Sequence, residues 1–266
     1  MPDVWRLLDE LDVPRTAASQ MAVDLALLDE VASGGAPALR LYTWSGPALS
    51  LGRFQPEVDV DAGACRRFGV DVVRRPTGGR ALLHGGDVTY AAVFPRPSGA
   101  AGSVDALYRT LARALIAGLD RLGVRAEVGR GDGEVGAACL SAARGADLRV
   151  GDRKLCGSAQ LQREGVVLQH GSVLCRRLAV DESDLLVFAD DRARDVTRRT
   201  LRERTVTLAE LGAPSGPDDV ATALTWGFAQ TLDLKWRSKV EGASAGPWRA
   251  PNAAAEPTAP KVSTCP

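Results

Sequence analysis

Apolar residues recur along this chain with two different periods, one typical of helices and one typical of strands. Between 104 and 122 they return every three or four positions, which predicts a long amphipathic helix. The same spacing predicts a helix over 17–32, ended by the glycine pair that follows it, and another over 220–232. Shorter helical segments are expected over 58–68, over 181–199 and after Thr207, which forms a capping-box pattern with Glu210.

Other segments are rich in β-branched and aromatic residues and therefore predict strands. These segments are 5–8, 39–44, 48–51, 71–75, 88–94, 124–128, 147–150, 154–162 and 166–174. Turn residues predict hairpins at 45–47, at Gly151-Asp152 and at 163–165. Strands joined by such tight turns favour an antiparallel sheet over a doubly wound one.

The composition is that of an ordinary globular domain with no net charge. Of 266 residues, 45% are hydrophobic and 25% are charged, and Lys plus Arg and Asp plus Glu number 33 each. Such a balance gives no overall field to attract nucleic acid or an anionic membrane, so neither is predicted as a partner. Residues 1–240 have the patterning of one folded domain, whereas 241–266 are rich in proline and alanine and are expected to be a disordered tail.

Signals for export, membrane insertion and zinc binding are absent from the sequence. Neither the N-terminus nor any later segment has the apolar length of a signal peptide or a membrane span. Five cysteines, an odd number, do not suggest a disulfide framework, and two histidines without a C-x-x-C pair do not suggest a zinc site. We therefore expect no metal and a location in the reducing cytoplasm.

The stretch 71–94 combines glycines with basic side chains between two expected strands. Gly78 and Gly79 allow the backbone to bend sharply and to approach a ligand, and Arg75 and His84 lie in the same stretch. Such a turn suits a carboxylate, a phosphate or a polarised carbonyl, although a tight hairpin with solvated arginines has the same composition. The spacing matches neither a P-loop nor a dinucleotide-binding fingerprint.

A cysteine and a lysine form the best candidate for covalent catalysis. Cys139 is set among small residues that would leave its thiol accessible, and Lys154 follows 15 residues later, early in an expected strand. An ammonium near a thiol lowers the thiol pKa, and the thiolate can attack a thioester while the lysine handles the proton. A small buried cysteine and a surface lysine would give the same pattern.

The strand that begins at Lys154 offers a second thiol. Alternation places Cys156, Ser158 and Gln160 on the same face as Lys154, so Cys156 can line the same pocket or simply pack there. His170, alone in its strand, fits a structural role better than a catalytic one. Serine-based catalysis has no support, because no Gly-x-Ser-x-Gly elbow is present.

Three separate motifs, taken together, resemble one known superfamily. They are Arg-Arg-Pro-Thr-Gly-Gly-Arg-Ala-Leu-Leu-His (74–84), Gly-Asp-Arg-Lys-Leu-Cys-Gly-Ser-Ala-Gln (151–160) and Gln-His-Gly-Ser (169–172), and the runs 44–54 and 21–24 fit as well. In this order they resemble the lipoate–protein ligase A, octanoyltransferase and biotin protein ligase superfamily over about 5–232. The resemblance implies an α/β fold of the α+β type, a single domain with a mixed, largely antiparallel sheet packed against helices.

Within that superfamily the sequence is most similar to the cysteine–lysine octanoyltransferases of the ligase-A-like type. In these enzymes the nucleophilic cysteine precedes the Lys-x-x-Gly-Ser-Ala lysine by the interval that separates Cys139 from Lys154. The resemblance implies that these two residues are catalytic. It implies that the substrate is bound by Arg75, Gly78, Gly79, His84 and Ser158.

The implied reaction is a transfer in two steps through an acyl-enzyme. Acyl carrier protein would donate an octanoyl group from its thioester to Cys139, with Lys154 keeping the thiol ionised and protonating the leaving thiolate. The group would then pass to a lysine of a lipoyl carrier domain, such as glycine-cleavage H protein. No cofactor is expected, because the thioester is already activated.

Three other functions are consistent with the same motifs. One is an ATP-dependent lipoate–protein ligase that uses ATP and magnesium and binds the acyl adenylate with Lys154. Another is relay of a lipoyl or octanoyl group between carrier proteins, and the third is a non-catalytic binding subunit of the same fold. The chain departs from the pattern of its relatives at Gly85-Gly86-Asp87, where acidic residues are frequent, and at Cys156, where a small residue is usual.

Overall fold

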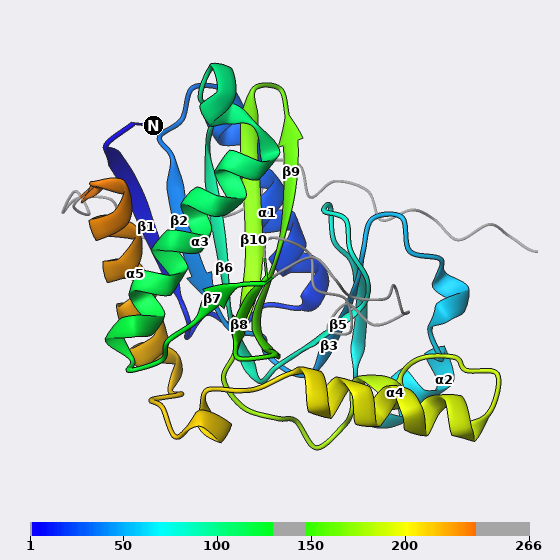
Figure 1. Ribbon diagram of the computed structural model, residues 1–266. Helices are drawn as coiled ribbons and strands as arrows, with labels where there is room; N and C mark the ends of the chain where they lie inside the picture. The colour runs from blue at the N-terminus through cyan, green and yellow to red at the C-terminus, as the bar shows by residue number, and fades with distance from the viewer. Residues whose placement is uncertain (1, 130–146, 238–266) are drawn as a thin grey trace, which may run out of the picture.

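The structure is a computed structural model that describes residues 2–129 and 147–237 (Figure 1). Its helices are α1 (Ala17–Ala32), α2 (Ala62–Phe68), α3 (Val104–Arg121), α4 (Asp191–Arg204) and α5 (Pro217–Leu232). Its strands are β1 (Val4–Glu10), β2 (Ala38–Tyr42), β3 (Ala48–Leu51), β4 (Asp71–Arg74), β5 (Leu82–His84), β6 (Asp87–Pro95), β7 (Glu127–Val128), β8 (Leu148–Val150), β9 (Arg153–Arg163), β10 (Val166–Leu174) and β11 (Lys235–Trp236). Short 3₁₀ helices are η1 (Glu57–Asp59), η2 (Gly99–Gly102), η4 (Glu182–Asp184) and η5 (Ala209–Leu211).

The main sheet is mixed, with strands in the order β11-β1-β2-β6-β10-β9-β8-β7. β1 is parallel to β2 and to β11, and the other neighbouring pairs are antiparallel. The hairpins predicted at Gly151-Asp152 and at 163–165 are confirmed, since they join β8 to β9 and β9 to β10. The mixed, largely antiparallel sheet that the resemblance implied is therefore confirmed.

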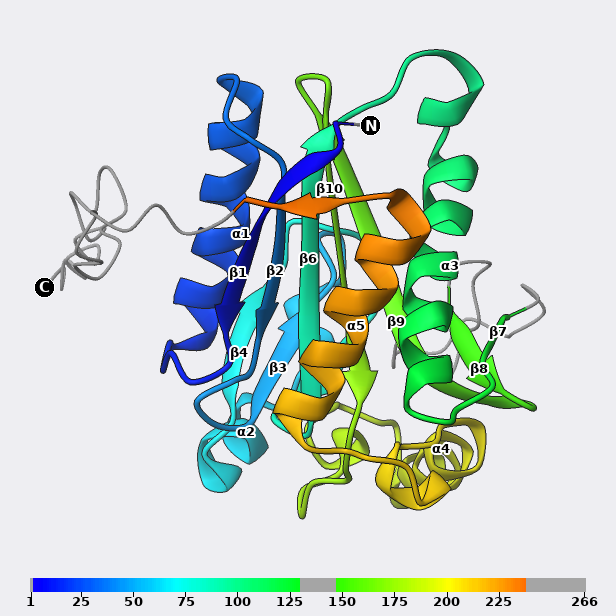
Figure 2. The same ribbon diagram turned by 90° about the vertical axis from the view of Figure 1, so that its left-hand side faces the viewer.

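Helices cover both faces of the main sheet: α1 lies against one face, and α3 and α5 lie against the other (Figure 2). The alternation of β6 shows this arrangement in one strand. Tyr90 and Phe94 pack in the core beneath α3 and α5, whereas Ala91 and Val93 pack in the core beneath α1. A strand buried on both faces has no polar side, which explains why β6 reads as a nearly continuous apolar run.

A smaller sheet, in the order β4-β3-β5, stands beside the main one, and it corrects one prediction. The hairpin predicted at 45–47 is wrong, because β2 pairs with β1 and β6 while β3 pairs with β4 and β5. Both strands are buried along their whole length, so each needs partners on two sides and finds them in its own sheet. The apparent turn is the crossing between the sheets.

Hydrogen bonds between side chains and backbone amides set where several helices begin. Thr207 and Glu210 form the reciprocal capping contacts that their spacing predicted, with the Glu210 amide donating to Oγ1 of Thr207 and the Thr207 amide donating to Oε2 of Glu210. The helix predicted over 58–68 begins later, because Asp61 caps α2 by accepting from the Ala64 amide. None of the helices in the described residues is long and apolar enough to cross a membrane.

Glycines set the distance between α3 and α5. A Cβ atom added at Gly227 would lie 2.3 Å from the Ala114 carbonyl oxygen and 2.5 Å from the Gly118 nitrogen. A Cβ atom added at Gly118 would lie 2.9 Å from the Ala223 carbonyl oxygen. The two backbones therefore approach so closely that no side chain fits between them.

We predict that Gly227→Ala destabilises the fold, although alanine is the better helix former. In an open helix position this change stabilises by about 1 kcal/mol, whereas overpacking a close helix contact costs about 1–3 kcal/mol. Urea denaturation should therefore show a lower free energy of unfolding for Gly227→Ala. The control is Gly63→Ala at an exposed position of α2, where an added Cβ atom would meet only the side-chain oxygen Oδ1 of Asp61, at 3.2 Å, so the change should be close to neutral; equal effects of both changes would contradict the close-contact argument.

Candidate active site

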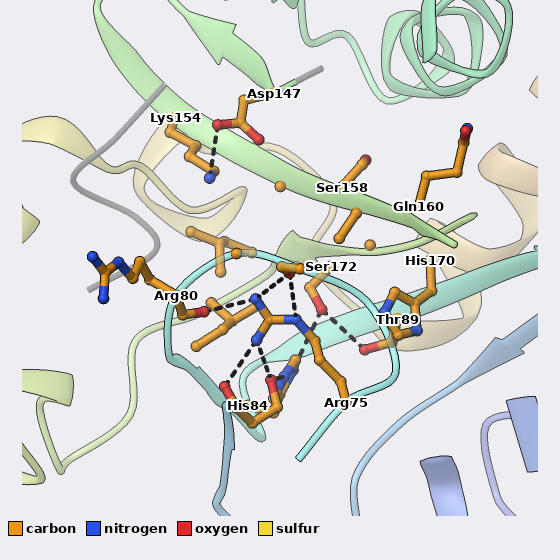
Figure 3. A pocket seen from close by; sticks show the side chains of 18 of the residues that line it. Arg75, Arg80, His84, Thr89, Asp147, Lys154, Ser158, Gln160, His170 and Ser172 are labelled. Atoms are coloured by element: carbon orange, nitrogen blue, oxygen red, sulfur yellow. Dashed lines mark hydrogen bonds and ion pairs between the residues drawn. The ribbon is translucent and has the colours of Figure 1, made fainter. Parts of the chain in front are cut away.

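A cavity of about 280 Å³ is lined by strands of both sheets (Figure 3). β9 and β10 contribute one wall, and β3, β5 and the glycine-rich loop contribute another. The structure brings to this cavity every described residue that the sequence predicted for the site: Arg75, Gly78, Gly79, His84, Lys154 and Ser158. Cys139 lies outside the described residues, so its predicted role and the roles of the others stay predictions.

Lys154 is buried in the cavity wall and forms an ion pair with Asp147. Its Nζ lies 2.9 Å from Oδ2 of Asp147, and the two side chains are 2% and 5% exposed. A Cβ atom added at Gly157 would lie 2.8 Å from Cε and 2.9 Å from Nζ of Lys154, so the glycine leaves the space that the ammonium fills. Asp147 was not predicted as a site residue; its position directly before β8, the strand that forms a hairpin with the strand of Lys154, was the available signal.

The described residues Gly129 and Asp147, which precede and follow 130–146 in the sequence, lie close together. The Gly129 amide donates to the Asp147 carbonyl oxygen at 2.7 Å, and β7 pairs with β8 next to it. β8 in turn pairs with the start of β9, where Arg149 lies opposite Lys154. Gly129 and Asp147, the described residues on either side of 130–146, are therefore hydrogen-bonded to one another next to Lys154.

Arg75 shapes the glycine-rich loop. Its guanidinium donates to the carbonyl oxygens of Ser50, Gly78 and Arg80 at 2.9, 2.9 and 2.7 Å. The loop also depends on close backbone packing, because a Cβ atom added at Gly52 would lie 1.9 Å from the Gly79 carbonyl oxygen. Arg75 thus holds the wall in place through backbone carbonyls, and direct contact with substrate stays a prediction.

His84 is held in one orientation by a carboxylate and a hydroxyl. Its Nδ1 lies 2.9 Å from Oδ2 of Asp87 and its Nε2 lies 2.8 Å from Oγ of Ser50, while the ring stacks on Trp44 at 4.1 Å. Burial alone would raise the pKa of Asp87, but the charge and hydrogen bond of His84 and the Gly85 amide hold it below its usual value. An ionised carboxylate can only accept, so Nδ1 is the donor and Nε2 accepts from Ser50 when the ring is neutral.

His170 has a matching arrangement on the other side of the cavity. Its Nδ1 lies 3.0 Å from Oδ2 of Asp24, and its Nε2 lies 2.7 Å from Oγ1 of Thr77. Asp24 also accepts from Nη1 of buried Arg40 at 2.7 Å. Burial would raise the pKa of Asp24, yet the hydrogen bond of His170 and the charge of Arg40 lower it. The sequence indicated a structural His170; the structure shows a bonded histidine that also lines the cavity.

The described cysteines do not supply a thiol to the cavity. Cys156, the rival to Cys139, is fully buried in the core beneath α3 and α5 and is not part of the cavity wall. Burial, with the nearby Asp147 charge, raises the pKa of the Cys156 thiol to about 12. Of the two possibilities that the sequence left open for Cys156, the structure favours packing in the core over a place in the pocket wall. Cys65 and Cys175 are also buried, and burial raises the pKa of both.

The rest of the lining is mixed in a way that suits an acyl chain with a reactive end. Met21, Trp44, Leu82 and Leu174 give apolar surface, and Lys154 with Asp147 marks a charged end. Within 2–129 and 147–237, no group of three or more His, Cys, Asp or Glu side chains is arranged to hold a metal ion.

Comparison with known proteins gives a consistent family. Residues 16–229 match the lipoyl protein ligase A/B catalytic domain. Octanoyltransferase LipM of Kyrpidia tusciae is 42% identical over 248 residues, which cover 87% of this chain and 88% of that protein. Octanoyltransferase LipM of Symbiobacterium thermophilum is 38% identical over 244 residues, which cover 86% of this chain and 87% of that protein.

Solved structures of lipoate protein ligases have a similar fold. A bipartite lipoate protein ligase from Thermoplasma acidophilum matches with a TM-score of 0.70 at 27% identity, over 89% of this chain and 86% of that one. Lipoate-protein ligase A bound with ATP also has a TM-score of 0.70, at 25% identity over 89% of this chain and 88% of that one. The resemblance drawn from the three motifs is confirmed, and the chain belongs to the lipoyl protein ligase A/B catalytic domain family.

Proposed function

We propose that this protein is an octanoyltransferase of protein lipoylation that forms a thioester on Cys139. The donor is the octanoyl thioester of an acyl carrier protein, and the acceptor is a lysine of a lipoyl carrier domain, glycine-cleavage H protein among them. Relatives that match over most of the chain are octanoyltransferases. The observation that carries the proposal is the buried Lys154–Asp147 pair at the charged end of an otherwise largely apolar cavity.

The positions of Asp147 and Gly129, which follow and precede the segment with Cys139, support Cys139 as the nucleophile. Cys139 is only eight residues from Asp147 in the sequence, and a chain that spans about 3.3–3.6 Å per residue is long enough to bring the thiol to the ion pair. The other tether, Gly129, is hydrogen-bonded to the same Asp147. The buried Cys65, Cys156 and Cys175 offer no rival nucleophile in the described part of the chain.

The first half-reaction transfers the acyl group to the enzyme. The Cys139 thiolate attacks the thioester carbonyl, a new carbon–sulfur bond forms, and the bond to the donor's sulfur breaks. The Lys154 ammonium gives its proton to the leaving thiolate and becomes neutral. Asp147 fixes the position of the amine beside this path before the transfer and stabilises the ammonium whenever it is re-formed.

The second half-reaction reverses the proton's direction. The neutral amine of the acceptor lysine attacks the acyl-enzyme carbonyl, and the bond between that carbon and the Cys139 sulfur breaks. Lys154 takes the proton that the attacking nitrogen loses, so the starting thiolate and ammonium are restored. The reaction requires no nucleotide, because the thioester is already activated and amide formation is downhill.

We predict that the protein forms an octanoyl adduct on Cys139 in the absence of nucleotide. After incubation with octanoyl-acyl carrier protein, peptide mapping by mass spectrometry should place the added group on the peptide with Cys139. Cys139→Ala should abolish the adduct and lower transfer by at least about 100-fold, because the covalent route is lost. The control Cys156→Ala, in the core, should retain both. ATP-dependent transfer from free octanoate with Cys139→Ala still active would indicate a ligase instead.

We predict that Asp147→Asn slows acyl-enzyme formation by about 10–100-fold while the protein stays folded. The amide keeps the shape of the side chain but no longer holds the ammonium in place, and misplacing a catalytic group costs rates of this order. Single-turnover kinetics with octanoyl-acyl carrier protein should show the loss in rate, with little change in the donor concentration that half-saturates it. Asp152→Asn, at an exposed position of the same hairpin, should change neither quantity. An unaltered rate in Asp147→Asn would remove the positioning role.

A further inference from the structure

A second cavity, of about 320 Å³, shares part of its wall with the first. It is lined by the chain after β10, by η4 and by the C-terminal end of α4. Leu174 lines both cavities. Thr205 lines the second one, and the next residue, Val206, donates its amide to the Lys154 carbonyl oxygen at 2.9 Å. The second cavity therefore adjoins the backbone of the lysine that lines the first.

A buried acid in this second cavity lacks a full set of hydrogen bonds. Glu182 is 5% exposed; its Oε2 accepts from the Leu83 amide at 3.1 Å, whereas its Oε1 has no hydrogen-bond partner within the described residues. Buried polar groups of this kind are nearly always bonded, so the free atom indicates a missing partner. Burial raises the pKa of Glu182 to about 8, so its carboxyl is mostly protonated at neutral pH and can both donate and accept.

Arginines surround the mouth of this second cavity. Nε of Arg177 lies 3.0 Å from Oε1 of Glu210, and Nε of Arg202 lies 3.4 Å from Oδ2 of Asp181. Arg176 is exposed, and its guanidinium donates to the Gly85 carbonyl oxygen at 3.4 Å. The lining thus combines these three guanidinium groups with the carboxyl groups of Asp87, Asp181, Glu182 and Glu210. An arginine with no carboxylate partner among the described residues suits a phosphate.

We propose that the second cavity binds the phosphopantetheine arm of the thioester donor. The inference rests on the proposed function, since it assigns a place to that donor. The arm has a phosphate at one end, two amides and a hydroxyl along its length, and the thioester at the other end. Arg176 meets the phosphate at the mouth, Glu182 bonds an amide, and the thioester end is directed past Leu174 toward Lys154. The volume is within the range of about 300–1,000 Å³ that is usual for small-molecule sites.

The same chemistry is present in an acyl carrier protein and in coenzyme A, so the test uses both sources and shortened donors. Acyl-enzyme formation is measured with octanoyl-acyl carrier protein, octanoyl-coenzyme A, octanoyl-phosphopantetheine, octanoyl-pantetheine and the octanoyl thioester of 2-mercaptoethanol. The last has no amide and no phosphate. The readout is the second-order rate constant for each pair of donor and variant, on the full chain.

Glu182→Ala should lower this rate constant about 10-fold with each donor that carries the pantetheine amides and leave it unchanged with the mercaptoethanol thioester. Glu182→Gln, which keeps a donor and an acceptor, should stay within about 3-fold of the parent. A fold defect would lower the rate with every donor, so the unchanged rate with the short donor excludes it. Equal losses with long and short donors, or no loss with any, would overturn the assignment of Glu182.

Arg176→Gln should lower the rate constant about 5–10-fold with the phosphorylated donors and leave it unchanged with octanoyl-pantetheine and the mercaptoethanol thioester. The matched control is Arg192→Gln, an exposed arginine in the first turn of α4 that lines neither cavity; it should change no rate. A loss with the carrier protein but not with octanoyl-coenzyme A would overturn the proposal, because it would show protein docking rather than binding of the arm. If the parent protein forms no adduct with any donor, the result contradicts the proposed function itself, and the assignment of the second cavity falls with it.

Discussion

The buried ion pair of Lys154 with Asp147 constrains the structure around the first cavity. A charge removed from water is stable only when it is paired, and losing one partner of a buried pair costs about 3–5 kcal/mol. The protein satisfies this requirement with local structure: the β8–β9 hairpin places the two residues near one another, and Gly157 leaves room for the amine. The backbone carbonyl of Asp147 also accepts from the Gly129 amide, so the described residues on either side of 130–146 meet at this pair. The proposed chemistry is therefore built on an interaction that the fold already needs.

Paired polar groups also hold the rest of the cavity wall in place. Two histidines, His84 and His170, face the cavity, and each is bonded at both ring nitrogens, to a carboxylate on one side and to a hydroxyl on the other. Buried carboxylates hold their charge because these partners are present. Polar groups that already have hydrogen-bond partners within the wall need no partner from the ligand. An acyl chain can therefore occupy the cavity without leaving these ionisable residues unbonded.

The two cavities differ in the state of their polar groups, and the proposed role of each rests on this difference. In the first, the histidines and Arg75 are bonded within the protein, and the charged pair marks where a reaction can occur. In the second, Glu182 keeps an unbonded oxygen and Arg176 has no carboxylate partner among the described residues. An acyl chain in the first cavity and a polar arm in the second would meet beside Lys154, with Leu174 between them.

The sequence by itself determined the long helices, the hairpins around Gly151 and Glu164, and the family, because each depends on neighbours in the chain or on motifs of fixed spacing. It also named most of the cavity wall through the glycine-rich stretch and the strand of Lys154. Tertiary structure decided what depends on distant partners. It separated β2 from β3, since a fully buried strand carries no signal for its partner. It withdrew Cys156 into the core and brought in Asp24, Asp87 and Asp147, whose roles exist only because folding places a histidine or a lysine within hydrogen-bonding distance of each.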